Sequence, residues 1–481
     1  MKLPRSSIER VLSSFCSARL GDPRRHRRLE MTLEALARRP DATFPQAMGS
    51  DAAVQGGYRL VNSPRMTFDV LIEAQADAVV VRGSDAELVL AIHDTTTCKF
   101  EHVDPAELGY LNTGKAGFRF HYTLAVDFHG HRRPLGVVHG EALFRAKPPR
   151  KRRKKRASNS SATTTRKKPN REFERWQRGV DMASKRLKGR AVVHVADRES
   201  DSYELMADAI EHGRRFVFRA RVTARRGCDA QGESSTIEAL ARKADSKLTR
   251  EVPLSRRRAI QGLKTAHPDR AARDAQLLVS STRVKIKRPN YLPRSLPPEL
   301  ELNVVRVCES HTPAGAEPVE WILYTTEPVD TAEQLAQVVD IYRARWLIEE
   351  CNKALKTGCL YQEREFESRA ALLALLGMSL PIACEILWLR HRARAEPNQP
   401  ATRVLTPLQI QVVRSLGSRK LPRSPTARDL LLAVADMGGH HPSNGDPGWQ
   451  ILQRGMSRVL AYEEGWRAAL AQRAGATCDG S

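Results

Sequence analysis

The apolar positions of this chain follow a helical period near both ends and strand patterns between them. Residues 1–70 are polar with helical spacing, and Asp22 and Pro23 mark the start of the clearest helix, since aspartate is a favoured N-cap and proline fits the first helical position. Residues 215–325 contain alternating and β-branched segments, and helical sequence returns at Thr331. This order of elements predicts an α/β fold with an inserted sheet.

Two continuous apolar runs in the first half of the chain each end in an aspartate. Leu88–Ile92 predicts a buried strand followed by Asp94, and the segment RAVVHVADRESD predicts a second buried strand followed by Asp197. A hairpin with its turn near His129-Gly130 lies between the two strands. Ligand sites in α/β sheets are built at the carboxyl ends of strands, so we expect both aspartates to belong to one site.

A long helix is predicted from Thr331 to Gly358. Thr331 and Gln334 fit a capping box, and glycine commonly follows the last residue of a helix. At about 100° per residue, a stripe only about 60° wide holds four polar side chains, and Glu350 falls outside it. The four are Tyr342, Arg345, Glu349 and Lys356. Such a stripe suits either a water-facing side or one wall of an active site, and the helix alone leaves both open.

Asp94, Asp197 and Glu349 together supply three carboxylates, enough to hold a pair of hard divalent cations. Mg²⁺ suits them because it prefers carboxylate oxygens and keeps several waters. Two such ions about 3.5–4 Å apart clamp the attacking and leaving oxygens of an in-line phosphoryl transfer. This chemistry needs no separate general base, so His93 is expected to pack within its strand.

The charge balance narrows the choice of partners. The 481 residues carry 79 Lys plus Arg against 55 Asp plus Glu, a formal charge of +24, and the pI is near 10.1. This excess favours nucleic acid, because each neutralised phosphate releases counterions, with an anionic membrane surface as the alternative. Four arginines oppose the dipole of the helix after Asp22, which indicates either phosphate contact or a solvated basic face. They are Arg24, Arg25, Arg27 and Arg28.

Residues 145–170 are basic and then Ser/Thr-rich, without apolar periodicity. We expect a disordered surface loop that adds nonspecific affinity for DNA. A merely solvated loop and a nuclear localisation signal are the alternatives.

Several other classes of protein are disfavoured. The eight cysteines form no C-x-x-C pair, which argues against a zinc site or a disulfide framework and suits a reducing cytosol. The N-terminus lacks the apolar segment of a secretory signal. The one membrane-like run, Ala371 to Leu389, contains Pro381 and Glu385, and a central carboxylate costs about 2.5–3.5 kcal/mol on membrane insertion. We therefore expect a buried core helix.

The motifs as a whole resemble those of bacterial DDE transposases of the insertion-sequence-four family. The chain matches the Y-R-E-K motif of that family as Tyr342-x2-Arg345-x3-Glu349-x6-Lys356. The contexts HDTTT and ADRESD of the two aspartates agree, as do LGDPRRHRRL and QGGYRLVNSP near the N-terminus. The resemblance touches most of the chain and is weakest over the basic segment.

The resemblance implies a ribonuclease-H-like catalytic core with an inserted antiparallel β-sheet, flanked by an N-terminal helical DNA-binding domain and a C-terminal helical domain. The end-binding domain would span residues 1–70. The catalytic domain would span 71–369, with the basic loop at 145–170 and the inserted sheet at about 215–325. Residues 370–481 would form the helical domain that pairs two protomers.

The resemblance also implies roles for single residues. Asp94, Asp197 and Glu349 would be the catalytic residues and the ligands of two Mg²⁺ ions, for which Mn²⁺ can substitute. Trp321 would stack on a base flipped from the DNA end, a contact worth about 1–3 kcal/mol, and its alternative is a strand aromatic packed in the core. Phosphates of the DNA end would be bound by Tyr342, Arg345, Lys356 and, as a further candidate, Arg219.

The implied activity is cut-and-paste transposition of double-stranded DNA by a homodimer that brings inverted-repeat ends together. Strand hydrolysis, hairpin formation, hairpin opening and strand transfer into target DNA would follow one another. The implied location is the bacterial cytoplasm, at the nucleoid, with no membrane partner. Two alternatives stay open: a catalytically inactive or domesticated DNA-binding relative that regulates transposition, and a host nuclease with the same core. The complete set of carboxylates argues against the first, and the separate terminal modules argue against the second.

Overall fold

The computed structural model describes residues 5–146, 173–254, 270–441 and 447–476. The chain forms two compact units, and each is described by itself. Unit 1 consists of Met1–Ala86, Thr95–Arg150 and Leu347–Ser481, and unit 2 consists of Glu87–Asp94 and Lys151–Trp346. The predicted basic loop lies outside the described residues, apart from its first two positions.

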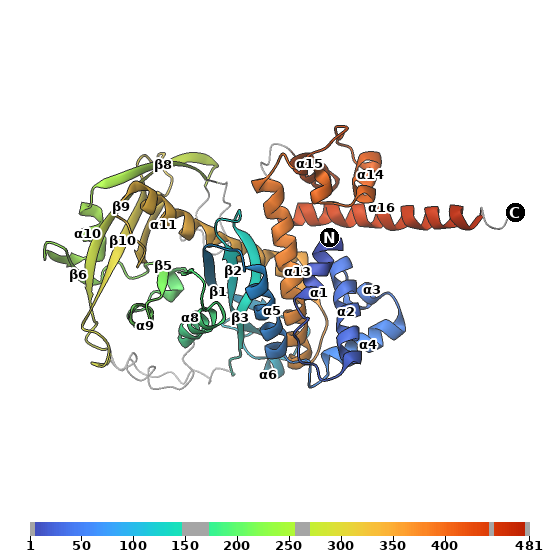
Figure 1. Ribbon diagram of the computed structural model, residues 1–481, viewed down its shortest axis with the longest axis horizontal. Helices are drawn as coiled ribbons and strands as arrows, with labels where there is room; N and C mark the ends of the chain where they lie inside the picture. Colours follow the sequence, from blue (N-terminus) through green and yellow to red (C-terminus); the bar gives the residue numbers. More distant parts are fainter. Residues whose placement is uncertain (1–4, 147–172, 255–269, 442–446, 477–481) are drawn as a thin grey trace. The chain divides into compact units, whose positions relative to one another are not determined.

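Three parallel strands form one side of the sheet in unit 2 (Figure 1). β4 (Val192–Ala196) lies between β1 (Val89–Lys99) and β5 (Arg215–Arg219), and β1 contributes its residues up to Asp94 to this unit. The strands are apolar on both faces, as expected where helices cover a parallel sheet. The unit also contains α8 (Glu174–Arg186), the short helix η1 (Arg198–Ser200), α9 (Tyr203–Glu211) and α10 (Ile237–Lys243).

The sheet continues beyond β5 through antiparallel strands, which make up most of it. The order from β5 onward is β11, β10, β9, β6 and β7, and β8 also pairs with β9. These strands are β6 (Arg226–Asp229), β7 (Ser234–Thr236), β8 (Ser246–Leu254), β9 (Arg273–Lys287), β10 (Glu299–Glu309) and β11 (Glu320–Thr325). The fold is therefore mixed α/β with an antiparallel insertion. The strand at the start of the predicted insertion, β5, instead runs parallel to β4 and belongs to the parallel part.

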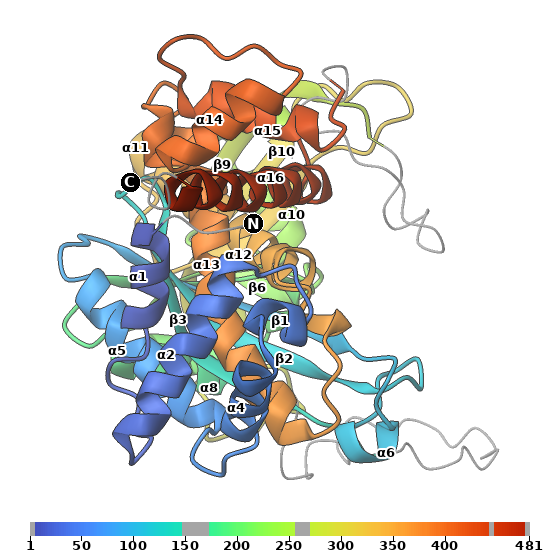
Figure 2. The ribbon, with the colours of Figure 1, turned by 90° about the vertical axis from the view of Figure 1, so that its right-hand side faces the viewer.

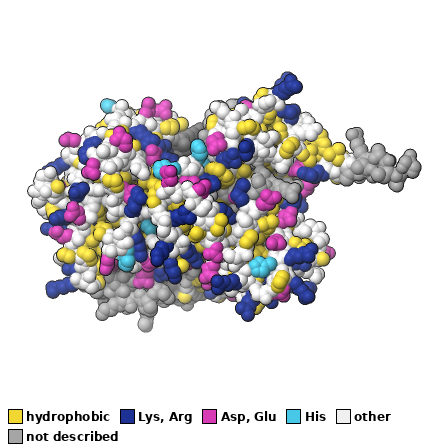
Figure 3. Space-filling view, in the orientation of Figure 1, with side chains coloured by type: hydrophobic (Ala, Val, Ile, Leu, Met, Phe, Trp, Pro, Cys, Tyr) yellow, Lys and Arg dark blue, Asp and Glu magenta, His cyan; other side chains and the backbone are white. Residues whose placement is uncertain are grey.

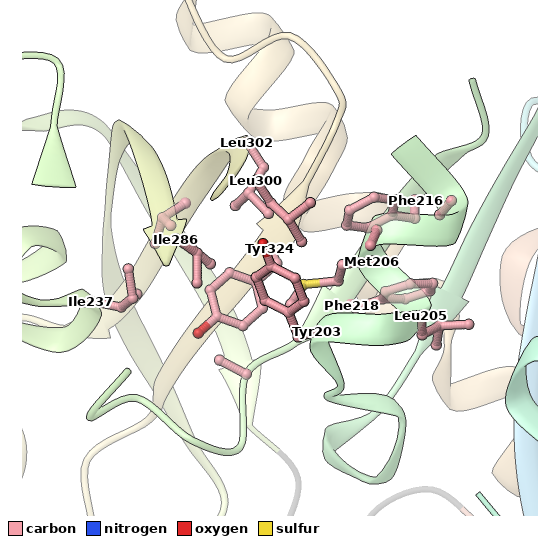
Figure 4. Close-up of a cluster of buried hydrophobic side chains, with 14 of the residues drawn as sticks. Tyr203, Leu205, Met206, Phe216, Phe218, Ile237, Ile286, Leu300, Leu302 and Tyr324 are labelled. Carbon is pink, nitrogen blue, oxygen red and sulfur yellow. The ribbon is translucent and has the colours of Figure 1, made fainter. Parts of the chain in front are cut away.

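One hydrophobic cluster joins the parallel and antiparallel parts of unit 2 (Figure 4). Phe216 and Phe218 of β5 meet Tyr324 of β11, Leu302 of β10 and Met206 of α9, and none of these side chains is more than 4% exposed. Burying a side chain of this size contributes about 1.5–3 kcal/mol, so the insertion is held to the parallel strands by packing as well as by the β5–β11 ladder.

The helical segment after β11 differs from the prediction. α11 (Ala332–Ala344) starts with the expected capping box between Thr331 and Gln334 and packs on β4, β5 and β8. The helix then breaks at Arg345, resumes as α12 (Trp346–Lys353) and ends in a π-helical turn, η2 (Ala354–Gly358). The amide of Cys359 donates to the carbonyl of Ala354 at 2.8 Å, a wider ring than that of an α-helix. The prediction of one continuous α-helix was therefore wrong.

β1 is also longer than predicted, because the strand continues past Asp94 to Lys99. Threonine is β-branched and favours extended backbone, and three threonines follow the aspartate. Thr96 is buried and Thr97 exposed, the alternation of a strand with two different faces.

The N-terminal helices of unit 1 form a small helical group (Figure 2). α2 starts as predicted, with the Asp22 carboxylate accepting a hydrogen bond from the Arg24 amide at 2.8 Å and Pro23 at the first helical position. Phe44, Tyr58 and Phe366 pack ring against ring, with centroids 5.1–5.5 Å apart. The helices are α1 (Arg5–Ser13), α2 (Pro23–Arg38), α3 (Phe44–Met48), α4 (Asp51–Val61) and α5 (Phe68–Arg82).

A hairpin of β2 (Gly117–Asp127) and β3 (Arg133–Leu143) follows the short helix α6 (Pro105–Leu108) in unit 1. Its turn lies at the predicted position, and His131 and Arg132 adopt positive φ angles there. Asp127 is 6% exposed and accepts a hydrogen bond from the Gly130 amide, so this carboxylate stabilises the turn.

α13 (Arg369–Ala395) is the one described helix that is long and apolar enough to cross a membrane, and 83% of its most apolar window is buried. It packs against α5 and β3, and its Glu385 forms an ion pair with Arg10. This burial is the packing expected of a core helix.

The chain ends in helices packed on one another, and α16 continues beyond α14 and α15 (Figure 1). Leu452, Met456 and Val459 of α16 are buried at 8%, 4% and 0% exposure. These side chains therefore lie in the core of this helical group, together with Val412 and Val434. These helices are α14 (Pro407–Leu416), α15 (Ala427–Met437) and α16 (Trp449–Ala476).

Candidate active site

Asp94 and Asp197 are placed by the register of β1 and β4 in unit 2. Ile92 pairs with Val195 across the two parallel strands, so the positions two residues further on are Asp94 and Asp197. Side chains two residues apart share a face of the sheet, and adjacent strands lie about 4.8 Å apart. Both aspartates are partly exposed. The two carboxylates therefore start from neighbouring positions on one face, as predicted from the two apolar runs.

The Asp197 carboxylate is oriented by the chain that follows it. Its Oδ1 atom accepts a hydrogen bond from the Glu199 amide at 2.9 Å, which caps the short helix η1. This contact leaves the second oxygen of the carboxylate for a further partner.

His93 is a packing residue of the opposite face. It is fully buried, and its Nε2 atom lies 3.0 Å from Nδ1 of His194. The other ring nitrogen of His194 lies 3.0 Å from the Ser184 hydroxyl of α8. Burial lowers the pKa of His194 to about 3, so the ring stays neutral in this chain of hydrogen bonds.

Three of the predicted DNA-binding residues meet at one place in unit 2. The rings of Trp321 and Tyr342 pack edge to face with centroids 5.4 Å apart. Arg219 donates to the carbonyl of Glu320 at 3.2 Å, and Tyr342 lies close enough to raise the pKa of its guanidinium against the effect of burial. Trp321 is partly exposed, whereas Tyr342 is only 5% exposed. Tyr342 is therefore not an aromatic on an open charged face, because α11 presses its ring onto the sheet.

This aromatic pair lies in a positive environment. Burial lowers the pKa of Arg219, and the nearby charges of Arg198 and Arg345 lower it further, against the favourable influence of Tyr342. Arg198 directly follows Asp197 and was missed in the sequence, although its place beside a candidate ligand could have singled it out. Trp346, an aromatic that is 54% exposed, follows Arg345 at the start of α12 and was also missed.

Glu349 and Glu350 lie next to each other on α12 in unit 1 but have different environments. The Glu350 carboxylate pairs with Arg390 of α13 at 2.6 Å, with both side chains less than 15% exposed. Glu349 is partly exposed and points from another side of the helix. A third side of α12 faces β2, where the Tyr122 hydroxyl donates to Asn352 at 2.9 Å. Glu350 thus ties α12 to α13, which agrees with the choice of Glu349 as the candidate ligand.

Lys356 lies on the π-helical turn η2 and is partly exposed. Its charge acts on the Cys98 thiol of β1, although burial outweighs it and raises the pKa of that thiol to about 12. π-Turns inside helices occur often at functional sites.

The donor atoms suit a hard metal ion as far as they are placed. Asp94 and Asp197 offer carboxylate oxygens from one face of the sheet, which is the chemistry that Mg²⁺ prefers. In the part of the chain that the structure describes, no three His, Cys, Asp or Glu side chains gather as around a metal ion. The predicted third ligand, Glu349, belongs to unit 1.

The four arginines of α2 divide into two pairs. Arg25 donates to the carbonyl of Leu20 at 2.8 Å, and the guanidinium of Arg28 packs so tightly on Gly56 of α4 that a Cβ atom there would lie 2.7 Å from it. Arg24 and Arg27 are exposed. The first pair supports the fold of the helical group, and the second faces solvent. On the face seen in Figure 3, Lys and Arg side chains are interspersed with Asp and Glu and form no single patch.

Two family models match the chain. Residues 11–66 match a transposase DNA-binding domain, and residues 162–382 match the transposase DDE domain. A solved structure, the piggyBac transposase synaptic complex with hairpin DNA, aligns with 81% of this chain at 13% identity and a TM-score of 0.31. The chain covers 66% of that structure's chain.

The chain therefore contains a transposase DNA-binding domain and a DDE transposase domain. These two matches support the prediction of a DNA-binding transposase, and a DDE domain implies a ribonuclease-H-like core. The first match contains α2 with its arginines. The second contains Asp197, Trp321, Glu349 and Lys356, and it begins after Asp94. The assignment of Asp94 therefore depends on its register with Asp197, and the individual site residues stay predictions.

Proposed function

We propose that this chain is a cut-and-paste DNA transposase of the insertion-sequence-four family, resembling the transposase of transposon five. It binds the inverted-repeat ends of its element and hydrolyses one strand at each end. The freed 3′-hydroxyl attacks the opposite strand to form a hairpin, which is then opened. The 3′-ends finally attack the target DNA.

The observation that carries the proposal is the shared register of Asp94 and Asp197 on neighbouring parallel strands, of which only Asp197 lies in the segment that matches the DDE domain. Together with Glu349, these carboxylates would hold two divalent cations, Mg²⁺ or Mn²⁺. When bound, such ions polarise the phosphodiester and lower the pKa of a bound water. The Glu199 amide fixes one oxygen of Asp197, which leaves the other oxygen free to face the ions.

The positive side chains beside the carboxylates would position the DNA strand. Arg219 and Arg345 lie near Tyr342, and their guanidinium groups suit bidentate contacts to phosphate oxygens. Lys356 would bind a further phosphate of the end. These fixed arginine and lysine side chains would also stabilise the negative charge that develops on the phosphoryl oxygens during strand cleavage.

Trp321 would hold a base that leaves the stack when the hairpin forms. Its ring is partly exposed, and Tyr342 packs against it edge to face, so the indole is fixed before DNA binds. Stacking on a fixed aromatic offsets the cost of unstacking a base at a sharply bent strand. Tyr342 thus acts chiefly by positioning Trp321 and Arg219.

The terminal modules would recognise DNA and pair protomers. Arg24 and Arg27 would contact phosphates of the element end from the exposed side of α2. From its middle onward α16 exposes apolar side chains, Tyr462 at 44% and Leu470 at 49%, beside Leu416 of α14 at 52%. An apolar surface of this kind supports pairing with a second copy in the DNA complex.

The test uses a labelled duplex that carries the element end, with and without Mg²⁺. Wild type is expected to nick the end and form a hairpin only with Mg²⁺. Asp94→Asn should bind the end normally but lose both products, because the amide is a poorer metal ligand of the same size. Asp245→Asn, which changes an exposed carboxylate of unit 2, is the matched control and should cut like wild type.

Binding without cutting by wild type in Mg²⁺ and in Mn²⁺ would contradict the proposal. The regulatory DNA-binding relative would then be the better description.

A further inference from the structure

A cleft of about 300 Å³ opens in unit 1 between α1, α5, β3 and α13. Four arginines contribute to its wall, and the only carboxylate among its lining residues is that of Glu385. The arginines are Arg10, Arg82, Arg133 and Arg392. Four guanidinium groups and one carboxylate leave the lining with a formal charge of +3. The proposed transposition chemistry uses none of these residues.

The single carboxylate is fully engaged by one of the arginines. Glu385 accepts from Arg10 at 2.9 Å and 2.7 Å in a two-pronged ion pair. The nearest other carboxylates lie beyond hydrogen-bond distance, with Asp85 and Asp127 both 3.6 Å from Arg133 and Glu396 3.8 Å from Arg392. Arg82, Arg133 and Arg392 are therefore only partly neutralised.

These three arginines are held in place by neutral groups. Arg82 donates to the carbonyls of Leu135 and Arg10, each at 2.9 Å. Arg133 donates through Nη2 to the Arg82 carbonyl at 3.2 Å, and Arg392 donates through Nη2 to the Gln399 side chain at 2.6 Å. Carbonyl and amide oxygens fix the guanidinium groups without removing their charge. The guanidinium groups of the cleft are thus preorganised.

Unused donors remain in this arrangement. The Nε groups of Arg133 and Arg392 are buried and have no hydrogen-bond partner within the described residues, although Nε of Arg392 forms the 3.8 Å ion pair with Glu396. A buried donor left unpaired is unfavourable. Burial, reinforced by the charges of Arg10 and Arg133, also lowers the pKa of Arg82 despite the opposing charge of Glu385. An added anion would offset the mutual repulsion of these guanidinium charges.

We propose that this cleft binds a phosphate group. Guanidinium forks match the oxygens of phosphate, and several partly neutralised guanidiniums converge here. The volume exceeds that of phosphate alone, and the indole of Trp388 with Leu135 and Pro381 gives an apolar wall for an attached sugar or base. The ligand is either a phosphodiester of a DNA strand, outside the proposed active site, or a free phosphorylated molecule. The inference does not depend on catalysis at Asp94 and Asp197.

The test titrates the full-length protein with sodium phosphate at constant ionic strength, with chloride as the reference. Wild type should show a saturable change in tryptophan fluorescence and a rise in its unfolding temperature. Trp388→Phe should lose most of the fluorescence change but keep the thermal shift, since the chain has six tryptophans and only this one lines the cleft. Arg133→Gln should bind phosphate at least about tenfold more weakly.

Arg133 is the suitable position because its side chain is 36% exposed, so the substitution is tolerated better than one at Arg10, which would strand Glu385. Arg454→Gln, at an exposed arginine of α16, is the control of equal charge and should bind phosphate like wild type. A circular dichroism spectrum and an unfolding curve of each variant check that it is folded.

A second arm identifies the source of the phosphate. Binding of a duplex without the element end is measured over a salt series. If DNA supplies the ligand, Arg133→Gln should reduce the salt slope by about one relative to Arg454→Gln. If a free molecule supplies it, the two variants should share one slope while only Arg133→Gln loses phosphate binding. Equal phosphate binding by both variants, or no difference between phosphate and chloride with wild type, would overturn the proposal.

Discussion

The carboxylates of the candidate site are delivered by two kinds of secondary structure that constrain them differently. Asp94 and Asp197 lie at the carboxyl ends of two parallel apolar runs, where every second side chain points to the same face of the sheet. The pairing of Ile92 with Val195 places the two aspartates opposite each other on adjacent strands. Glu349 lies on α12, between a helix break at Arg345 and the π-turn at Ala354–Gly358. The position of a side chain on a strand thus follows from its nearest pairs. The direction of a side chain on this helix depends on every irregularity that precedes it.

Substitutions of the adjacent residues Glu349 and Glu350 test which of the two carboxylates of α12 takes part in strand cleavage. We expect Glu349→Gln to reduce strand cleavage by at least about 10³-fold, because losing one charge-stabilising ligand removes several kcal/mol from the transition state. Its unfolding free energy should stay near that of wild type. Cleavage of the labelled end duplex and urea unfolding measure the two effects.

Glu350→Gln is the matched variant and should do the reverse. It removes the charge that Arg390 pairs with, and breaking an ion pair this buried costs about 3 kcal/mol of stability. Cleavage per folded molecule should remain close to wild type. An exchange of the two phenotypes would show that α12 presents Glu350, and not Glu349, to the DNA.

A smaller effect is expected where the helix meets the sheet, at Trp321 and Tyr342. Trp321→Ala should slow hairpin formation by about 5- to 150-fold, which corresponds to the 1–3 kcal/mol of one stacked base, and leave the first nick almost unchanged. Tyr342→Phe keeps the edge-to-face contact and loses only the hydroxyl next to Arg219, so it should cost about 1 kcal/mol or less at either step. Quenched-flow analysis of nicked and hairpin products separates the steps. Equal slowing of both steps by Trp321→Ala would assign the indole to packing alone.

The strands β1 and β4 can be tested through His93 and His194, which pack on the face of the sheet opposite the two aspartates. The pKa of His194 is about 3 in the folded chain and about 6.5 when unfolded, so between these values the unfolded chain binds a proton that the folded chain does not. The contribution of neutral His194 to the unfolding free energy is therefore fully present above pH 6.5 and decreases as the pH falls below this value. At pH 5 the loss is about 2 kcal/mol. His194→Asn should flatten this acid slope in urea unfolding, whereas His212→Asn, at a half-exposed histidine, should not. An unchanged slope in His194→Asn would show that other groups cause the acid sensitivity.

The local features of this fold were predictable from the sequence. The two apolar runs, the Asp22 cap, the Thr331 capping box and the hairpin turn depend on residues close in the chain, and each is present. The break at Arg345 has no proline or glycine to mark it, and the π-turn departs only locally from α-helical hydrogen bonding. The burial of Tyr342 and the Glu350–Arg390 pair depend on partners that are distant in sequence. Sequence periodicity gives the phase of a regular helix and carries no information about such partners.

The smallest expected effects concern α2. Substitutions there test which of its four arginines contact DNA and which support the fold, and they do not affect the catalytic residues. Arg24→Gln and Arg27→Gln change exposed arginines, so each should weaken binding of the element end and lower its salt slope by about one, with an unchanged unfolding temperature. Arg25→Gln and Arg28→Gln remove the contacts to Leu20 and Gly56 and should mainly lower the unfolding temperature by a few degrees. Fluorescence anisotropy over a salt series and thermal unfolding distinguish the pairs. A larger slope change in Arg28→Gln than in Arg24→Gln would mean that DNA draws Arg28 away from α4, and that the helical phase of the free protein does not decide which arginines bind.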